Sequence, residues 1–461
     1  MKLHHRLWVV WSIGLAAYLV GVMHRTSFGV AGLDAAARFH AAPAMLAGFV
    51  VLQLLVYAIL QIPVGVLLDR FGARKLIVLG ALTMAAGQLV LAVAADLPLA
   101  ILARVLVGAG DALTFISVLS VVTSWFPPRR VPLMTQLTGL IGQLGQVLSA
   151  VPLAAVLHGP GWTPAFVSAA ALGVAVGLAA FAVVRDRPPG APAPPPAPAT
   201  REVLHGLVCS WREPGTRLGF WTHLGTQFSG QVFALMWGVP YLVAGQGFST
   251  GAASAMLTLL VLAGIVAGPL FGEFTARHPF RRSWLVIAVI AVTVAVWTAV
   301  LAVPPPAPRW LIALLVVVLA LGGPTSMIGF DYARTFNPGH RQGAAVGIIN
   351  MAGFSATLTV SLAVGVVLGL AGPGGYTPEA FRVAWTVQYA VWALGLGGVL
   401  VARRRARNKM ASEGVVVPPL RKALAARRAT PERQDVPDGP PGSAPPRGSA
   451  VTRGPGTPRS R

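Results

Sequence analysis

The sequence predicts an all-α integral membrane protein in which twelve transmembrane helices form two pseudo-symmetric six-helix bundles. Hydrophobic residues make up 55% of its 461 residues and charged residues only 11%, a balance that a soluble single-core domain of this length does not keep. Apolar stretches of about 20 residues recur along the chain, each long enough to cross a hydrocarbon core of about 30 Å. A charged turn, Gly65–Lys75, returns in degraded form at Gly272–Arg282, as expected for two homologous membrane halves.

The apolar stretches end where charged or Pro-rich residues interrupt them. We expect membrane spans at residues 7–31, 43–68, 74–95, 99–125, 132–158, 163–184, 217–243, 251–276, 283–303, 309–332, 342–371 and 380–402. The first stretch begins at Leu7, which is too early for a cleaved signal peptide, and it is also too long for one. We therefore expect a retained helix.

These spans divide the chain into an N-terminal bundle at 1–184 and a C-terminal bundle at 217–402. The connector at 185–216 holds a Pro-rich run that is typical of an extended, semi-rigid spacer. The tail at 403–461 opens with three arginines that anchor the last span. Its richness in Arg, Pro, Gly and Ser predicts disorder.

The net charge of +22 would suit a nucleic-acid partner, but its placement predicts a membrane orientation instead. If the amino terminus, the even-numbered turns and the tail lie on one side, nearly all Lys and Arg residues fall there. The exceptions are Arg25, Arg38, Arg104, Arg309 and Arg382. By the positive-inside rule, we expect both termini in the cytoplasm. We also expect the membrane to be the plasma membrane, and we expect no nucleic-acid partner.

Cys209 is the single cysteine of the chain and lies in the predicted connector. It excludes an intrachain disulfide framework and a cysteine-cluster metal site. We expect neither a metal nor a cofactor.

The turn Gly65–Lys75 carries the most specific pattern in the chain. Gly65 removes a side chain where helices approach closely, and Gly72 can take the positive φ that a tight turn needs. Asp69 suits a helix N-terminus or an arginine, whereas anchoring alone needs no carboxylate. Arg74 and Lys75 suit the inner leaflet, and Arg70 is the third basic residue of the turn.

The second copy keeps the glycine and the basic residues but not the acid. Ala276 stands where the first copy has Asp69, and Pro279 stands where it has Gly72. Its retained members are Gly272, Arg277, Arg281 and Arg282. The two turns are therefore expected to differ energetically. For the basic residues, a purely topological role stays open.

The first turn resembles the signature between helices 2 and 3 of the major facilitator superfamily, where it tunes the packing of the two halves during alternating access. Further motifs look like the anion:cation symporter branch: Tyr57–Pro63, Arg104–Asp111, Trp125–Arg129 and His24–Ser27. That branch commonly has Asp-Arg in helix 1, and Arg followed seven residues later by Glu in helix 4. This chain has His24-Arg25 and Arg104…Asp111. The second half resembles the superfamily but not the branch.

Charges at membrane depth are costly, by about 2.5–3.5 kcal/mol each, so they face a partner or a wet cavity. Arg104 and Asp111 share one helix face, about 10 Å apart along the axis. Arg25 and Arg104 are expected to bind substrate, because a guanidinium fork suits a carboxylate or phosphate. Asp111 is the candidate for proton coupling, and His24 could share that role. The alternatives are that Arg25 snorkels to the interface and that Arg104 is structural, bonded to carbonyls and to Asp111.

Polar residues in other spans are weaker candidates for the substrate site. They are Tyr57, Gln143, Gln146, Gln227, Gln231 and Asn350. His223 joins Gln227 and Gln231 in one helical stripe. Helix–helix hydrogen bonds would explain such residues equally well. Asp331 and Arg334 are expected to form a local pair or gate contact.

We therefore expect a secondary transporter that works by alternating access, as a monomer, and takes up a small organic anion with protons. An exporter of a hydrophobic or cationic compound is the alternative in the same class. A non-transporting sensor or scaffold would not need the buried charges. An enzyme is not expected, since the outer loops hold few acids and no metal-ligand spacing. No phosphate-binding motif supports ATP-driven pumping.

Overall fold

The structure is a computed structural model that describes residues 3–40, 43–191, 200–371 and 376–417. The chain divides into two units, Met1–Val415 and Val416–Arg461. All the helices of the described residues lie in the first unit. Most of the predicted tail and part of the Pro-rich run lie outside the described residues.

The first half is helical throughout its described length. Its helices are α1 Leu3–Val30, α2 Gly32–Phe39, α3 Pro43–Phe71, α4 Ala73–Val93, α5 Leu97–Trp125, α6 Val131–Gln143, α7 Gly145–Leu148, a π-helical turn Ser149–Leu153, α8 Ala154–His158 and α9 Trp162–Val183. Asp96 caps α5, where its carboxylate accepts a hydrogen bond from the Leu99 amide at 2.9 Å. Pro152 lies within the π-helical turn, where it removes a backbone donor and so breaks the regular ladder.

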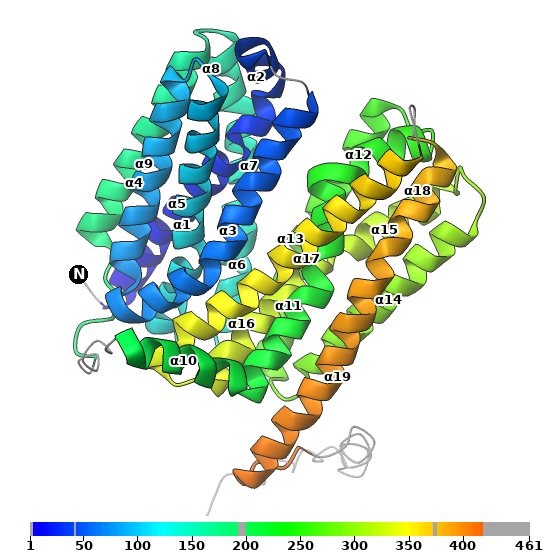
Figure 1. Ribbon diagram of the computed structural model, residues 1–461. Coiled ribbons are helices and arrows are strands. Elements are labelled where there is room, and N and C mark those ends of the chain that lie inside the picture. Colours follow the sequence, from blue (N-terminus) through cyan, green and yellow to red (C-terminus); the bar gives the residue numbers. More distant parts are fainter. Residues whose placement is uncertain (1–2, 41–42, 192–199, 372–375, 418–461) are drawn as a thin grey trace, which may run out of the picture. The chain divides into compact units, whose positions relative to one another are not determined.

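The second half repeats this pattern after the connector helix α10 Thr200–Arg212. Its elements are α11 Pro214–Val232, π-helical turns Phe233–Trp237 and Tyr241–Gly245 flanking α12 Gly238–Pro240, α13 Thr250–Arg277, α14 Arg282–Ala302, α15 Arg309–Ala320, α16 Gly322–Phe336, a 3₁₀ turn Gly339–Arg341, α17 Gln342–Leu370, α18 Pro378–Ala384, a 3₁₀ turn Trp385–Val387 and α19 Gln388–Ser412. Figure 1 shows the first half in blue to teal and the second in green to orange.

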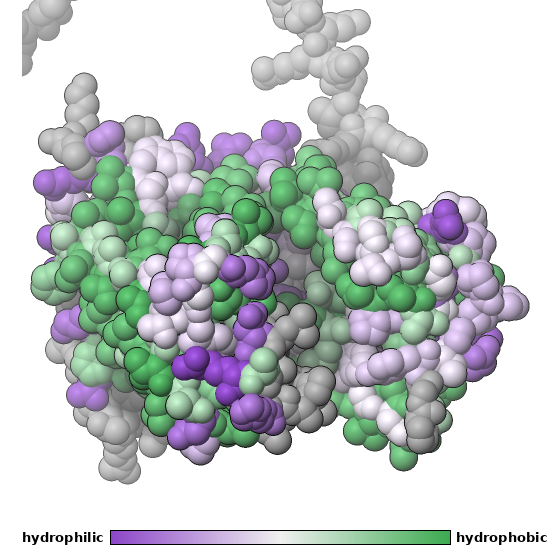
Figure 2. Space-filling view, turned by 90° about the horizontal axis from the view of Figure 1, so that it is seen from above, coloured by the Kyte–Doolittle hydropathy of each residue, from purple (hydrophilic) through white to green (hydrophobic). Residues whose placement is uncertain are grey.

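Twelve helical stretches among the described residues are long and apolar enough to cross a membrane. The prediction of an all-α, twelve-helix membrane fold is confirmed, and the expected spans match these stretches closely at most ends. Large apolar side chains stay exposed along them, such as Ile59, Val266 and Leu270, each at least 60% exposed. Such side chains suit contact with lipid. Figure 2, a view from above onto the ends of the helices, shows hydrophobic residues interspersed with hydrophilic ones on that face.

Two stretches differ from the expected domain boundaries. Helix α19 continues to Ser412, past residue 402, because contacts hold its basic end: Arg403 packs over the Trp284 ring at 4.3 Å, and Lys409 binds the Glu213 carboxylate. Part of the connector is the helix α10, with its apolar residues repeating at helical spacing.

The two halves contact each other mainly through α3 with α17 and α6 with α13. Gly65 and Gly343 allow the first contact, because a Cβ on either would collide with the backbone of the other. Near them, the turns Phe71–Ala73 and Arg277–Arg282 lie at the same end of the helices as α10. We call this the connector end (Figure 1).

Candidate functional site

Arg25 and Asp111 form a bidentate ion pair between α1 and α5. Arg25 Nε lies 2.6 Å from Asp111 Oδ2, and Nη2 lies 2.8 Å from Oδ1. The carboxylate is almost fully buried, whereas the Arg25 side chain is 13% exposed. The Arg25 guanidinium also stands over the Tyr57 ring, 5.3 Å from its centroid. The Arg25 guanidinium therefore binds Asp111 inside the protein. The alternative, that this side chain extends to the membrane interface, does not agree with the structure.

Arg104 is fully buried on the same helix as Asp111 but does not pair with it. One of its Nη groups donates to the Arg25 carbonyl at 3.0 Å and to Gln53 Oε1. Its guanidinium packs over the Phe28 ring at 5.1 Å. The Nε and the other Nη have no hydrogen-bond partner among the described residues. The cluster Arg25–Asp111–Arg104 thus holds two guanidiniums and one carboxylate.

Tyr57 and Asn350 connect this cluster to the second half. The Asn350 amide of α17 donates to the Tyr57 hydroxyl at 3.0 Å and to Gln61 Oε1 at 2.7 Å. The rings of Tyr57 and Phe354 lie 4.4 Å apart. Polar and aromatic contacts therefore link the two halves beside Arg25.

Gln143 and Gln146 lie together on another side of α1. Gln146 donates to Gln143 Oε1 at 2.6 Å, and Gln143 approaches the Tyr18 hydroxyl at 3.5 Å. Tyr18 packs on Phe115, one turn beyond Asp111 on α5. The glutamines thus reach the neighbourhood of the charged cluster through Tyr18.

The polar stripe of α11 splits into two parts. His223 and Gln227 are buried against Gly353 of α17, and His223 Nδ1 lies 3.1 Å from the Ser326 carbonyl. Within the described part of the chain, His223 Nε2 and Gln227 Oε1 lack hydrogen-bond partners. Gln231, one turn further along α11, is only half-buried.

His24 does not join Arg25, although it is the preceding residue. It is fully buried, and its Nε2 lies 2.9 Å from the Ala169 carbonyl of α9. A Cβ on Gly173 would meet its ring, so His24 faces the packing between α1 and α9. One residue of a helix turns the side chain by about 100°. The structure therefore separates the two residues that the sequence makes neighbours.

The signature turn joins the halves at the connector end. Asp69 accepts hydrogen bonds from the Gly343 amide at 2.7 Å and the Ala344 amide at 2.8 Å, at the start of α17. This is the helix N-terminus that its carboxylate suits. Gly72 has φ of 81°, which favours glycine.

The basic residues of that turn have mostly local contacts. Arg74 Nε donates to the Phe181 carbonyl at 3.0 Å, and its amide donates to Asp186 at 2.8 Å. Arg70 and Lys75 both stand over the Phe71 ring. Asp186, from the connector, thereby caps the start of α4.

The second copy of the turn has another arrangement. Gly272 meets Leu133 of α6, and the exposed Arg277 pairs with Glu273 at 2.6 Å. Arg281 stands just before α14. Arg282 is buried and binds Asp331, which also forms the expected pair with Arg334 at 2.5 Å. Arg282 is therefore not a surface anchor: it belongs to the cluster Arg282–Asp331–Arg334.

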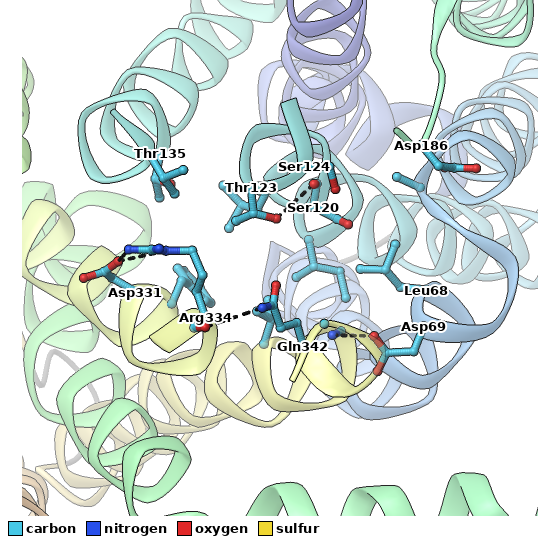
Figure 3. A pocket seen from close by; sticks show the side chains of 18 of the residues that line it. Leu68, Asp69, Ser120, Thr123, Ser124, Thr135, Asp186, Asp331, Arg334 and Gln342 are labelled. Carbon is cyan, nitrogen blue, oxygen red and sulfur yellow. Dashed lines mark hydrogen bonds and ion pairs between the residues drawn. The ribbon is translucent and has the colours of Figure 1, made fainter. Parts of the chain in front are cut away.

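A cavity of about 1070 Å³ opens at the connector end, lined by both halves. Figure 3 shows Arg334 and Gln342 on one side and the hydroxyl side chains of α5 across from them. The wall includes Ser120, Thr123, Ser124, Thr135, Gln136, Asp69, Asp186 and Asp331.

Sequence reasoning missed Tyr18, Gln53 and Asp186. Gln53 lies one helical turn before Tyr57 on α3. A polar residue inside a membrane span, four residues from another candidate, could have identified it from the sequence. The role of Asp186 depends on how α9 ends beside α4, which no local pattern encodes.

Comparison with known proteins agrees with this architecture. A sequence model described as Major Facilitator Superfamily matches residues 13–361. The chain is also similar to the "Probable nitrate/nitrite transporter NarK2" of Mycobacterium tuberculosis, in two strains. The two are 30% identical over 305 residues, which cover 65% of this chain and 74% of the relative. Together with its twelve membrane helices, this match places the chain in the major facilitator superfamily of multi-pass membrane transporters.

Proposed function

We propose that this protein takes up a small organic anion together with protons, by alternating access between its two halves. The plasma membrane is its site, with the connector end and both termini in the cytoplasm. It works as a monomer. The observation that carries the proposal is Arg104, a fully buried guanidinium without a carboxylate partner in the described part of the chain.

The charges of the cluster support an anionic substrate. Asp111 neutralises Arg25 through two hydrogen bonds, whereas Arg104 has no ion pair within 4 Å among the residues that the structure describes. A buried charge is strongly stabilised by an opposite charge. The free Nε and Nη1 groups of Arg104 can each donate a charge-assisted hydrogen bond to an anion.

The Arg25–Asp111 pair offers a route for proton coupling. A proton on Asp111 removes the negative charge that holds Arg25, which leaves two guanidiniums for the anion. Loss of that proton lets Asp111 compete with the anion for Arg25, which favours release. Proton and anion then bind together and leave together, as a symporter requires. His24 faces α9 instead of this pair, so Asp111 carries the role alone.

The mycobacterial relative points to nitrate or nitrite as a second candidate substrate. Nitrate is planar and carries one negative charge, so its oxygens can also accept hydrogen bonds from the buried Arg104 guanidinium. Export of a cation is less favoured, because Asp111 is already bound to Arg25.

The test is transport by purified protein in proteoliposomes, with and without an imposed proton gradient. Small mono- and dicarboxylates, nitrate, nitrite and a cationic drug are compared. We expect carboxylate uptake that an inward proton gradient accelerates. Transport of nitrate but of no carboxylate would replace the substrate class. Transport of the cation alone would overturn the anion proposal.

A further inference from the structure

The connector-end cavity holds hydroxyl groups and a guanidinium on opposite walls. Ser120, Thr123 and Ser124 follow one another along α5, and Arg334 projects from α16 (Figure 3). Arg334 is about one-fifth exposed, so its guanidinium reaches the cavity while still bound to Asp331. Hydroxyls and a guanidinium together can hold a carboxylate group.

The carboxylates that line this cavity are already occupied. Asp69 binds two backbone amides at the start of α17, and Asp186 binds one at the start of α4. Asp331 is shared by two arginines. Helix N-termini carry positive partial charge, so they offset the first two acids.

The charge of this wall is set by the Arg282–Asp331–Arg334 cluster, of which Arg334 and Asp331 belong to the lining. Arg282, behind Arg334, adds a second guanidinium to the single Asp331 carboxylate. Two arginines on one carboxylate give this cluster one net positive charge, which attracts anions and repels cations.

An apolar layer separates the cavity from the Arg25–Asp111–Arg104 cluster. Ile116, Leu119, Phe330 and Val346 belong to the lining, and the Phe115 and Phe330 rings of the two halves lie 5.8 Å apart. Along α5, Asp111 and Thr123 are twelve residues apart, or about 18 Å. Two anion-attracting regions therefore lie on one helix, with hydrophobic residues between them.

We propose that the connector-end cavity is a second binding site for the transported small carboxylate, in which Arg334 and the hydroxyls of Ser120 and Ser124 hold the anion. This inference rests on the proposed anion transport. The site receives the anion after it passes the apolar layer, and it keeps the anion near the protein until it leaves.

A labelling experiment tests the site without transport. Cys209 is the single cysteine, so Cys209→Ser with Ser124→Cys places one thiol in the wall of the cavity. The full-length protein in detergent reacts with an anionic and a cationic thiosulfonate of matched size. We expect the anionic reagent to react faster, and succinate to slow both reactions. Arg334→Gln should reduce the rate ratio several-fold and abolish protection by succinate.

Two variants sharpen this result. Arg277→Gln removes an equal charge from an exposed residue outside the lining, and should leave the ratio unchanged. Arg334→Lys keeps the positive charge, so the anionic reagent should still react faster than the cationic one by nearly the wild-type ratio. An unchanged ratio in Arg334→Gln, or an equal loss in Arg277→Gln, would overturn the site.

Transport then separates this inference from the proposed function. In oriented proteoliposomes, Arg334→Gln should raise the KM for succinate offered at the connector end by about tenfold, with little change at the opposite end. Equal KM values at both ends would overturn the site even if the wild type transports anions. If the wild type moves no anion, the proposed function fails, whereas the labelling result still decides whether the cavity binds one.

Discussion

The two halves each contain a cluster of two arginines and one aspartate, but the clusters use their charges differently. In Arg25–Asp111–Arg104, one arginine takes both carboxylate oxygens and the other takes neither. In Arg282–Asp331–Arg334, both arginines bind the same carboxylate. In the first cluster, Asp111 lies near the middle of its span and the two arginines lie nearer the end opposite the connector, whereas the second cluster lies near the connector end. Among the described residues, the same composition therefore leaves one guanidinium without a carboxylate in the first half and gives both arginines a carboxylate in the second.

The largest effect should come from Asp111→Asn. Asparagine cannot exchange a proton, so uptake driven by a proton gradient should fall by about 100-fold or more, to background. Exchange of labelled for unlabelled anion, which needs no net proton movement, should persist. Both are measured in proteoliposomes. Proton-driven uptake near the wild-type rate would remove Asp111 from coupling.

Arg104→Lys should come next, because lysine lacks the planar fork. Loss of a charge-assisted hydrogen bond is worth about 1.5–3 kcal/mol, so the KM for the anion should rise by about tenfold or more. Arg282→Lys is the matched change in the second cluster. It should lower the melting temperature of the purified protein and leave KM within about twofold. If both variants changed KM equally, the contrast between the clusters would be wrong.

Asp69→Asn tests the asymmetry of the two turns. Asparagine can accept one of the two backbone hydrogen bonds but carries no charge. The interaction of residue 69 with the start of α17 should therefore weaken by about 1–2 kcal/mol. Spin labels on α3 and α17 at the connector end should then show a broader distance distribution. Ala276→Asn, at the matching position of the second turn, is the control and should leave that distribution unchanged. A wild-type distribution in Asp69→Asn would show that these bonds do not hold the halves together.

The smallest effect should come from truncation after Val415. The helix α19 ends at Ser412, and Lys409 binds Glu213 near that end. A protein that ends at 415 keeps these contacts, so its transport rate should stay within about twofold of the wild type. Truncation after Ala402 removes Arg403 and Lys409, and should reduce the amount of folded protein recovered. A large loss of transport in the longer protein would give the tail a role.

The fold was predictable because each span must satisfy its own backbone hydrogen bonds in lipid, which leaves a strong local signal. The ion pair between Arg25 and Asp111 was not predictable from the sequence. Sequence spacing puts Arg104 and Asp111 on one face of α5, but about 10 Å apart, and only the packing of α1 decides which arginine reaches the acid. His24 shows the same limit, since its position beside Arg25 says nothing of which neighbour α1 turns it toward. Gln53 and Asp186 likewise depend on contacts between distant segments.

The contact of Asp186 with the start of α4 shortens the tether between the halves. The connector is bound to the first half at Asp186, and α10 contacts the second half at α17. Only about thirteen residues, from 187 to 199, join these two attachments, and a chain of that length reaches at most about 45 Å. The segment that joins the two attachments is thus much shorter than the interval between α9 and α11. Its length can be changed without altering a residue of either half.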